Sequence, residues 1–142
     1  MTGIDAKAQE VIEEFELFDD WMDKYNHLIE LGKSLPEISD SDKEDKYLVK
    51  GCQARVWLLA GLENGKVVFT ADSDALITKG IVALLIRVLS DQPPGDIVDA
   101  DLGFIDKIGL KEHLSQTRSN GLLNMIKQMK LYALAYQRSG QA

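Results

Sequence analysis

The feature that most constrains the fold is a β-hairpin predicted near the middle of the chain. The run from Gln53 to Leu62 is apolar and β-prone, and the run from Val67 to Ala71 has the same character. Between them lies the pair Asn64-Gly65, which favours a tight turn because both residues tolerate a positive φ. The sequence therefore predicts an antiparallel sheet, with Cys52 at one end of it.

Helical periodicity flanks this hairpin on both sides. Apolar residues recur at helical spacing from Ala6 to Phe18 and from Trp21 to Lys33. After the hairpin, a segment opened by Asp72-Ser73-Asp74 runs to about Ser90, and its nearly all-apolar surface indicates a buried central helix. A long helix from about Thr117 to Arg138 ends the pattern, and shorter helical turns are expected at 96–100 and within 102–110.

Residues that favour helix N-caps precede three of these helices. Asp5 is expected to cap the first, Asp72 or Ser73 the third, and Thr117 or Ser119 the last. Segment 34–45 holds a proline and five acidic residues, so it is expected to be a solvated loop, and 47–50 is expected to form a short strand. Together these elements predict one α/β (α+β) domain over residues 1–142, with a small antiparallel sheet packed by helices.

Charge and composition narrow the classes of function. The net charge of −7 argues against nucleic acid as a partner, because phosphate binding needs clustered Lys and Arg. No apolar run approaches the roughly 20 residues that span a bilayer. The first residues lack the basic and apolar regions of a secretory signal, and a single cysteine fits a reducing compartment. We therefore expect a cytoplasmic protein that binds neither nucleic acid nor a membrane.

Cys52 is the only cysteine in the chain, so it makes no internal disulfide and supplies too few thiolates for a zinc or iron–sulfur site. It remains a buried core residue, a reactive thiol or an intermolecular partner. Gly51 favours the reactive interpretation because glycine permits a tight turn or a close approach of another backbone. Lys50 and Arg55 would favour the thiolate if their charges pointed toward the sulfur. No metal site is expected, because Asp72 and Asp74 alone are too few ligands.

The residue inventory around Cys52 excludes several cysteine chemistries. A hydrolase needs a base, an orienting group and an oxyanion hole, and His113 is a weak candidate for the base, better explained by a structural role. A thioredoxin-type enzyme needs a Cys-x-x-Cys pair, which is absent. A single accessible thiol on a mobile loop suffices to attack the outer sulfur of a persulfide on another protein, take that sulfur and later release it.

Motifs along nearly the whole chain resemble the SufE/CsdE family of sulfur acceptors. The central motif is Gly51-Cys52-Gln53 followed by Val56-Trp57. The other matching blocks occur in the family order, and they are Leu28–Pro36, Asp72-Ser73-Asp74 with Thr78-Lys79-Gly80, His113-Leu114-Ser115, and Thr117–Leu122. Ala54 and Arg55 follow Gln53 where some relatives carry Ser-Gln, which leaves the cognate donor open.

The resemblance implies a SufE/IscU-like fold, similar to the NifU-like scaffold proteins of iron–sulfur cluster assembly. It implies a stoichiometric carrier rather than an enzyme, which stimulates a SufS- or CsdA-type cysteine desulfurase and forms a persulfide on Cys52. The sulfur then goes to a downstream iron–sulfur scaffold. The pyridoxal phosphate (PLP) belongs to the desulfurase, so this chain is expected to hold no cofactor. A monomer or weak homodimer is expected.

The resemblance also implies roles for residues around Cys52. Partner contacts are expected at Gly51, Gln53, Asp72, Asp74 and Arg118. Family members shelter the cysteine in an apolar cavity, which Val49, Val56, Trp57 and the helix beginning near Asp74 are expected to line here. Two other interpretations stay open from the residues alone: a thiol redox sensor that cycles through sulfenic acid, and an interaction module with a merely buried cysteine.

Overall fold

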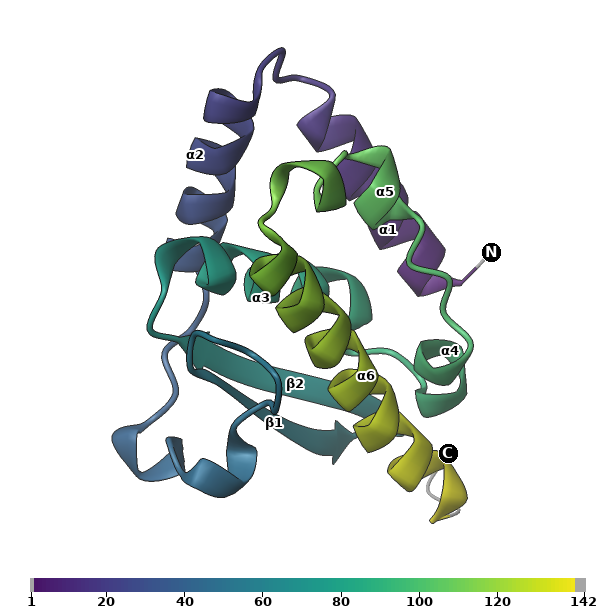
Figure 1. The fold of residues 1–142 in the computed structure, drawn as a ribbon. Helices are drawn as coiled ribbons and strands as arrows, with labels where there is room; N and C mark the ends of the chain where they lie inside the picture. Colours follow the sequence, from purple (N-terminus) through teal and green to yellow (C-terminus); the bar gives the residue numbers. More distant parts are fainter. Residues whose placement is uncertain (1, 140–142) are drawn as a thin grey trace.

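A computed structural model describes residues 2–139 as a two-stranded antiparallel sheet packed by helices, which confirms the α+β class (Figure 1). The strands are β1 (Val56–Glu63) and β2 (Lys66–Ser73). The helices are α1 (Gly3–Phe15), α2 (Trp21–Lys33), α3 (Leu76–Leu89), α4 (Pro94–Val98), α5 (Phe104–Lys107) and α6 (Gln116–Arg138). Short 3₁₀ turns are η1 (Asp40–Asp42), η2 (Asp45–Tyr47) and η3 (Lys111–His113). No helix within residues 2–139 is long and apolar enough to cross a bilayer.

The hairpin forms as predicted, with the turn at Asn64-Gly65. Both residues have a positive φ, 53° and 78°, which is the backbone twist that a two-residue turn needs. Glu63 pairs with Lys66, and the ladder continues to Val56 opposite Ser73. The first strand thus begins at Val56 rather than at Gln53, because the residues before it form the loop of Cys52.

Other segments cover both outer edges of the sheet. On β1, the carbonyl of Val56 accepts from the backbone N–H of Val49 at 2.9 Å. The carbonyls of Leu58 and Ala60 accept from the hydroxyls of Tyr132 and Tyr136 on α6, at 3.1 and 3.2 Å. On β2, three further bonds join the strand to the segment after α3; these are Val67 N to Gln92 O, Asp91 N to Val67 O, and Phe69 N to Ser90 Oγ. The short strand expected at 47–50 is thereby reduced to a single bridge, Leu48 with Trp57.

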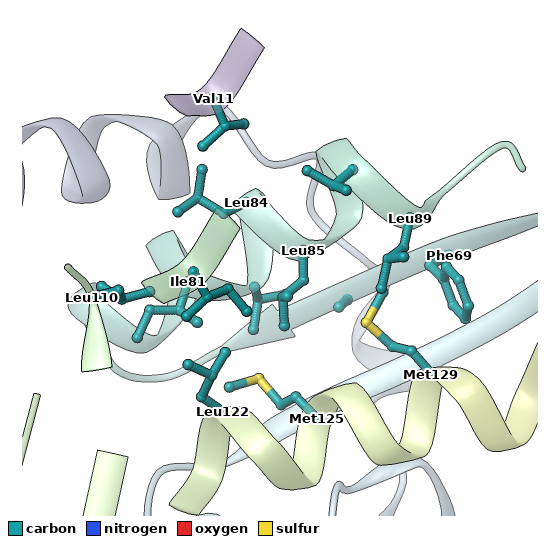
Figure 2. Packing of buried hydrophobic residues seen from close by; sticks show 14 of the residues in the cluster. Val11, Phe69, Ile81, Leu84, Leu85, Leu89, Leu110, Leu122, Met125 and Met129 are labelled. Atoms are coloured by element: carbon teal, nitrogen blue, oxygen red, sulfur yellow. The ribbon is translucent and has the colours of Figure 1, made fainter. Parts of the chain in front are cut away.

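Helix α3 lies at the centre of the molecule, as its apolar sequence predicts. It packs against α1, α2, β2 and α6. Figure 2 shows Leu122 and Met125 of α6 pointing toward Ile81 and Leu85 of α3, and Met129 pointing toward Leu89, all of them buried. One side of the core therefore forms between these two helices and the hairpin, and buried residues of α1 and α2 continue it on the other side of α3.

The approach of α2 to α3 depends on Gly80. A Cβ built at Gly80 would lie 2.2 Å from the carbonyl oxygen of Leu28, and one built at Gly32 would lie 2.9 Å from the backbone nitrogen of Gly80. The atoms that would clash are backbone atoms, so no side-chain rotation could relieve the overlap. This contact fixes the separation of the two helices.

The expected N-caps are wrong at α1, α3 and α6. Thr2 caps α1, and Asp5 instead bonds back to the Thr2 N–H in a capping box, so this helix starts and ends earlier than the periodicity suggests. Helix α3 has no side-chain cap, because pairing with β1 carries β2 through Ser73. Ser115 caps α6 by accepting from the N–H of Arg118 at 3.2 Å.

Candidate functional site

Cys52 lies on a short loop, residues 50–55, that joins the Leu48–Val49 segment to β1. The N–H of Val49 donates to the carbonyl of Val56 at 2.9 Å, which closes the base of the loop. Gly51 has a φ of 83°, a left-handed conformation that costs other residues free energy, so the position favours glycine. Gly51, Gln53 and Arg55 are exposed, whereas Cys52 is half-buried.

The side chain of Cys52 lines a pocket of about 350 Å³ between the loop, α3 and α6. Its thiol sulfur lies 3.6 Å from the carbonyl oxygen of Gly121 on α6. A Cβ on Gly121 would lie 3.5 Å from that sulfur, an ordinary van der Waals distance, so the thiol packs directly against α6 at this position. The pocket is lined by Cys52, Gln53, Ala54, Asp74, Ala75, Thr78, Ile81, Thr117, Arg118, Gly121 and Met125.

Three hydrogen bonds tie the loop to the elements around it. The side-chain amide of Asn124 on α6 donates to the carbonyl of Gly51 at 3.2 Å. The carboxylate of Asp74 accepts from the N–H of Arg55 at 3.1 Å, and the N–H of Asp74 donates to the carbonyl of Arg55 at 3.3 Å. The two ends of the loop are therefore held by different elements.

Burial raises the pKa of the Cys52 thiol above its usual range. The charges of Lys50 and Arg55 are not among the causes of this pKa shift, so the activation that they would give if they pointed toward the sulfur is not found. Arg118 and the first turns of α3 and α6 also border the pocket. Helix N-termini and a guanidinium favour a negative charge placed there.

The structure brings most of the predicted site residues together. Cys52, Gln53, Asp74 and Arg118 line the same pocket, and Gly51 lies beside Cys52 in the loop. Residues to which the sequence assigned no role complete it; Thr78, Gly121 and Met125 line the pocket, and Asn124 holds the loop. Thr78 and Gly121 fall within the matching motifs Thr78-Lys79-Gly80 and Thr117–Leu122, but no local pattern marks Asn124.

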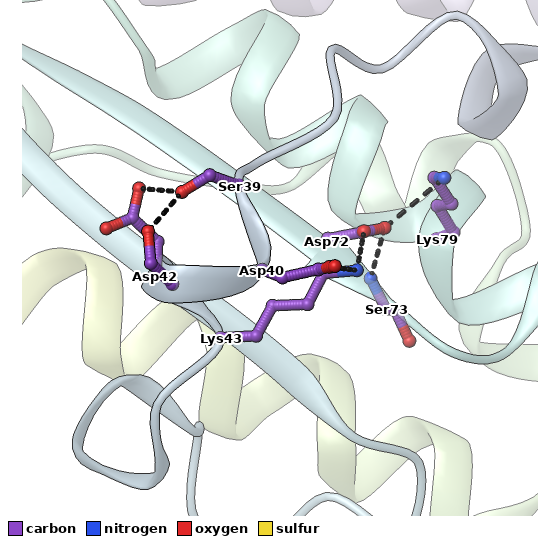
Figure 3. A network of polar contacts seen from close by, with 8 residues as sticks. Ser39, Asp40, Asp42, Lys43, Asp72, Ser73 and Lys79 are labelled. Carbon is purple, nitrogen blue, oxygen red and sulfur yellow. Dashed lines mark hydrogen bonds and ion pairs between the residues drawn. The ribbon is translucent and has the colours of Figure 1, made fainter.

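Asp72 is the exception, because its carboxylate is buried and faces other residues of the chain. It forms ion pairs with Lys43 and Lys79, each at 3.2 Å, and accepts from the N–H of Ser73 at 2.8 Å (Figure 3). The ammonium of Lys43 also lies 5.5 Å from the ring centre of Trp57. Asp72 thus fixes the loop of η1 against the end of the hairpin, and it is only 6% exposed.

The expected lining by Val49, Val56 and Trp57 is wrong. All three are buried, and none of them lines the pocket. Met125 of α6 lies beside Val56 and takes that place in the wall. The crossing of α6 over β1 is a tertiary feature that the periodicity of α6 alone does not predict.

His113 has the structural role that the sequence favoured over general-base catalysis. Its ring stacks on Trp21 with a centroid separation of 3.9 Å, and its Nδ1 lies 3.1 Å from the carbonyl of Gly109. It does not line the pocket of Cys52. Across residues 2–139, no three His, Cys, Asp or Glu side chains are grouped closely enough to hold a metal ion.

Comparisons with known proteins agree on one family. The family described as "SufE: Fe-S metabolism associated domain" matches residues 9–133. An uncharacterized SufE-like protein of Rhizobium etli is 39% identical over 130 residues, covering 88% of each chain. A similar protein of Rhizobium meliloti is 38% identical over 92% of this chain and 94% of its own length.

Two further similarities extend this finding. SufE-like protein 1 of Arabidopsis thaliana, described as chloroplastic/mitochondrial, is 38% identical over 95% of this chain but only 37% of its own length. The solution structure of a hypothetical protein from Thermus thermophilus superposes with a TM-score of 0.77 at 21% identity. That superposition covers 93% of this chain and 96% of the other, and it shows that the two share a fold.

Proposed function

This chain belongs to the SufE family, whose domain is associated with Fe-S metabolism, and on that premise we propose that it is a sulfur carrier. It accepts sulfur on Cys52 from a PLP-dependent cysteine desulfurase of the SufS or CsdA type and passes it on for iron–sulfur cluster assembly. The observation that carries the proposal is the setting of its only thiol, half-buried in a pocket at the tip of a loop.

The transfer is a thiol–persulfide exchange without net oxidation. The Cys52 thiol loses its proton, and the thiolate attacks the terminal sulfur of the donor's cysteine persulfide. The donor's S–S bond breaks as a new S–S bond forms at Cys52, and the released donor thiolate takes up a proton. Cys52 then carries the persulfide until a second acceptor attacks its outer sulfur in the same way.

The pocket suits the storage of this group. A volume of about 350 Å³ exceeds the need of one extra sulfur atom, and burial hinders attack by small thiols on the stored sulfur. Arg118 and the helix N-termini at the rim would favour a persulfide anion. PLP belongs to the donor in this proposal, so this chain needs no cofactor of its own.

The donor's docking surface is proposed around the pocket mouth. Gly51, Gln53, Asp74 and Arg118 are exposed there, so a partner can touch them. Asp72 is buried and pairs with Lys43 and Lys79, so it is not proposed to contact the donor. The chain acts as a stoichiometric carrier, proposed to work in the cytoplasm as a monomer or weak homodimer.

The test combines this protein with a cysteine desulfurase, free cysteine and PLP. Alanine release is expected to rise, and the intact mass of this chain is expected to rise by one sulfur, roughly 32 Da, reversibly by reductant. Cys52→Ser is the matched control and should lose both effects. No stimulation and no mass gain with several desulfurases would overturn the proposal, and rapid oxidation by peroxide without any partner would favour a redox sensor instead.

A further inference from the structure

We propose that Asn124 is a positioning residue that holds the Cys52 loop in its pocket, so that its one hydrogen bond sets how often the thiol is presented to a sulfur donor. The role in sulfur transfer rests on the proposed function. The positioning itself rests on the contact between the Asn124 amide and the carbonyl of Gly51.

The geometry of this contact is specific to the two residue types. The amide nitrogen of Asn124 lies 3.2 Å from the Gly51 oxygen, and a Cβ on Gly51 would come within 2.2 Å of that nitrogen. The backbone at Gly51 also has a φ of 83°. Any larger residue would therefore collide with Asn124 and strain the backbone, so the glycine before the cysteine is matched to the asparagine on α6.

Apart from the contact made by the thiol itself, the hydrogen bond from Asn124 is the one that holds the loop nearest to Cys52. The backbone pairing of Val49 with Val56 closes the base, and Asp74 holds the far end at Arg55. Cys52 itself contributes only a long S–H contact of 3.6 Å to Gly121, and a thiol is a weak donor. Release of Asn124 thus frees Gly51 and Cys52 while both anchors of the loop remain in place.

The size of the effect follows from the strength of one neutral hydrogen bond. Such a bond to a partly exposed carbonyl shifts an equilibrium by about 3- to 10-fold. Since the loop must leave the pocket before the thiol meets a bulky protein partner, loss of the bond should increase the presented fraction of Cys52 by this factor.

The first experiment measures alkylation of Cys52 by iodoacetamide in the protein alone, at fixed pH and temperature. Asn124→Ala is expected to react about 3- to 10-fold faster than wild type. Asn124→Leu keeps about the size of the side chain and adds no charge near the thiol, but it removes the donor, so it should also react faster. Asn120→Ala is the matched control on the same helix, because Asn120 bonds to Gln116 and not to the loop, and its rate should equal that of wild type.

A double-mutant cycle adds a readout that a general loss of stability would not give. Gly51→Ala is expected to speed alkylation, because the new methyl group collides with Asn124. In the Asn124→Ala background that collision is absent, so the same substitution should have a smaller effect. Independent, multiplicative effects would contradict direct contact between the two residues in the resting loop.

The outcomes separate this inference from the proposed function, because alkylation needs no desulfurase. Wild-type alkylation rates in both Asn124→Ala and Asn124→Leu, with unchanged melting temperatures, would overturn the positioning role. The positioning role would also be overturned if alkylation became faster only in proportion to a fall in the free energy of unfolding of the whole protein. Faster alkylation in folded variants, without any stimulation of a desulfurase by wild type, would establish the positioning and reject sulfur transfer.

Discussion

Glycine allows two segments to come unusually close in two regions of this molecule, with different consequences. At Gly80 in α3, an added Cβ would lie 2.2 Å from a backbone oxygen of α2, in the buried core. At Gly51 in the Cys52 loop, an added Cβ would lie at the same 2.2 Å, but from the side chain of Asn124 at the surface.

The difference lies in what can move. Separating α2 from α3 means shifting two helices whose apolar faces form the core, so the contact at Gly80 is permanent in the folded state. Separating Gly51 from α6 needs one side-chain rotation and the loss of one hydrogen bond. The same residue type thus fixes the fold in one region and permits release in the other.

The largest effect is expected from Gly80→Ala. The new methyl group would push α2 away from α3, and such overpacking should lower the free energy of unfolding by about 3 kcal/mol. For a chain of this size the melting temperature should fall by about 10 °C. Gly61→Ala is the control, because a Cβ there meets nothing within 4 Å. Equal melting temperatures for Gly80→Ala and Gly61→Ala would show that α2 and α3 can move apart at Gly80 without loss of stability.

Asp72→Ala should lower the stability of the fold, as Gly80→Ala does, although Asp72 lies near the Cys52 loop. Lys79, the residue before Gly80, and Lys43 both lose their buried partner, which should cost about 2 kcal/mol in urea unfolding. The control is Asp101→Ala, which removes an exposed carboxylate bonded to the Gly103 N–H. A large rise in Cys52 alkylation without loss of stability would instead show that Asp72 restrains the Cys52 loop and not the fold.

Acid should weaken the same cluster to a smaller extent. Burial alone would raise the pKa of Asp72, but hydrogen bonds from the Ser73 N–H, Lys43 and Lys79 outweigh it and hold the pKa below its usual range. The stability linked to this group is complete above the ordinary carboxyl pKa and is lost as the pH falls through the lowered one. Between about pH 6 and about pH 3, wild type should therefore lose more stability than Asp72→Asn. Equal losses would mean that the carboxylate is not stabilised in the fold.

The smallest change in stability is expected from Gly51→Ala, despite the short Cβ contact. The positive φ costs about 1 kcal/mol, and rotation of Asn124 or opening of the loop relieves the collision. The melting temperature should fall by less than half as much as in Gly80→Ala, while Cys52 alkylation should rise. If both variants lost the same stability, the distinction between a permanent and a releasable contact would fail.

The sequence predicts what short-range chemistry determines. Asn64-Gly65 sets the hairpin turn through the φ values of its own two residues. The nearly all-apolar pattern of α3 marks it as central, because exposing most of its surface to water would be unfavourable. The resemblance implied a partner contact at Asp72, but the structure buries its carboxylate. This burial could not be predicted, because it depends on an ion pair with Lys43, whose position comes from the fold of a polar loop. The N-cap predicted for α3 at Ser73 is wrong for a similar reason, because Ser73 pairs with Val56 in the sheet and does not cap the helix.

In the candidate site, too, some residues could be predicted from local sequence motifs and others could not. Cys52 and Arg118 are recognisable from motifs, and the structure places both at one pocket. Asn124 lies 73 positions from the glycine that it contacts, and no local pattern links them. Pairings of this kind depend on how α6 crosses the hairpin, which is determined by packing of the whole core.

The covered edges of the sheet also limit how a partner can be recognised. A bare strand edge invites β-strand addition, in which a partner extends the sheet through backbone hydrogen bonds alone. Here the outward carbonyls of β1 are taken by Val49 and by two tyrosines, Tyr132 and Tyr136. Because Val49 lies outside the loop, opening the loop does not expose this edge. Under the proposed function, selectivity for the sulfur donor would then come from the side chains around the pocket and not from backbone hydrogen bonds of the sheet.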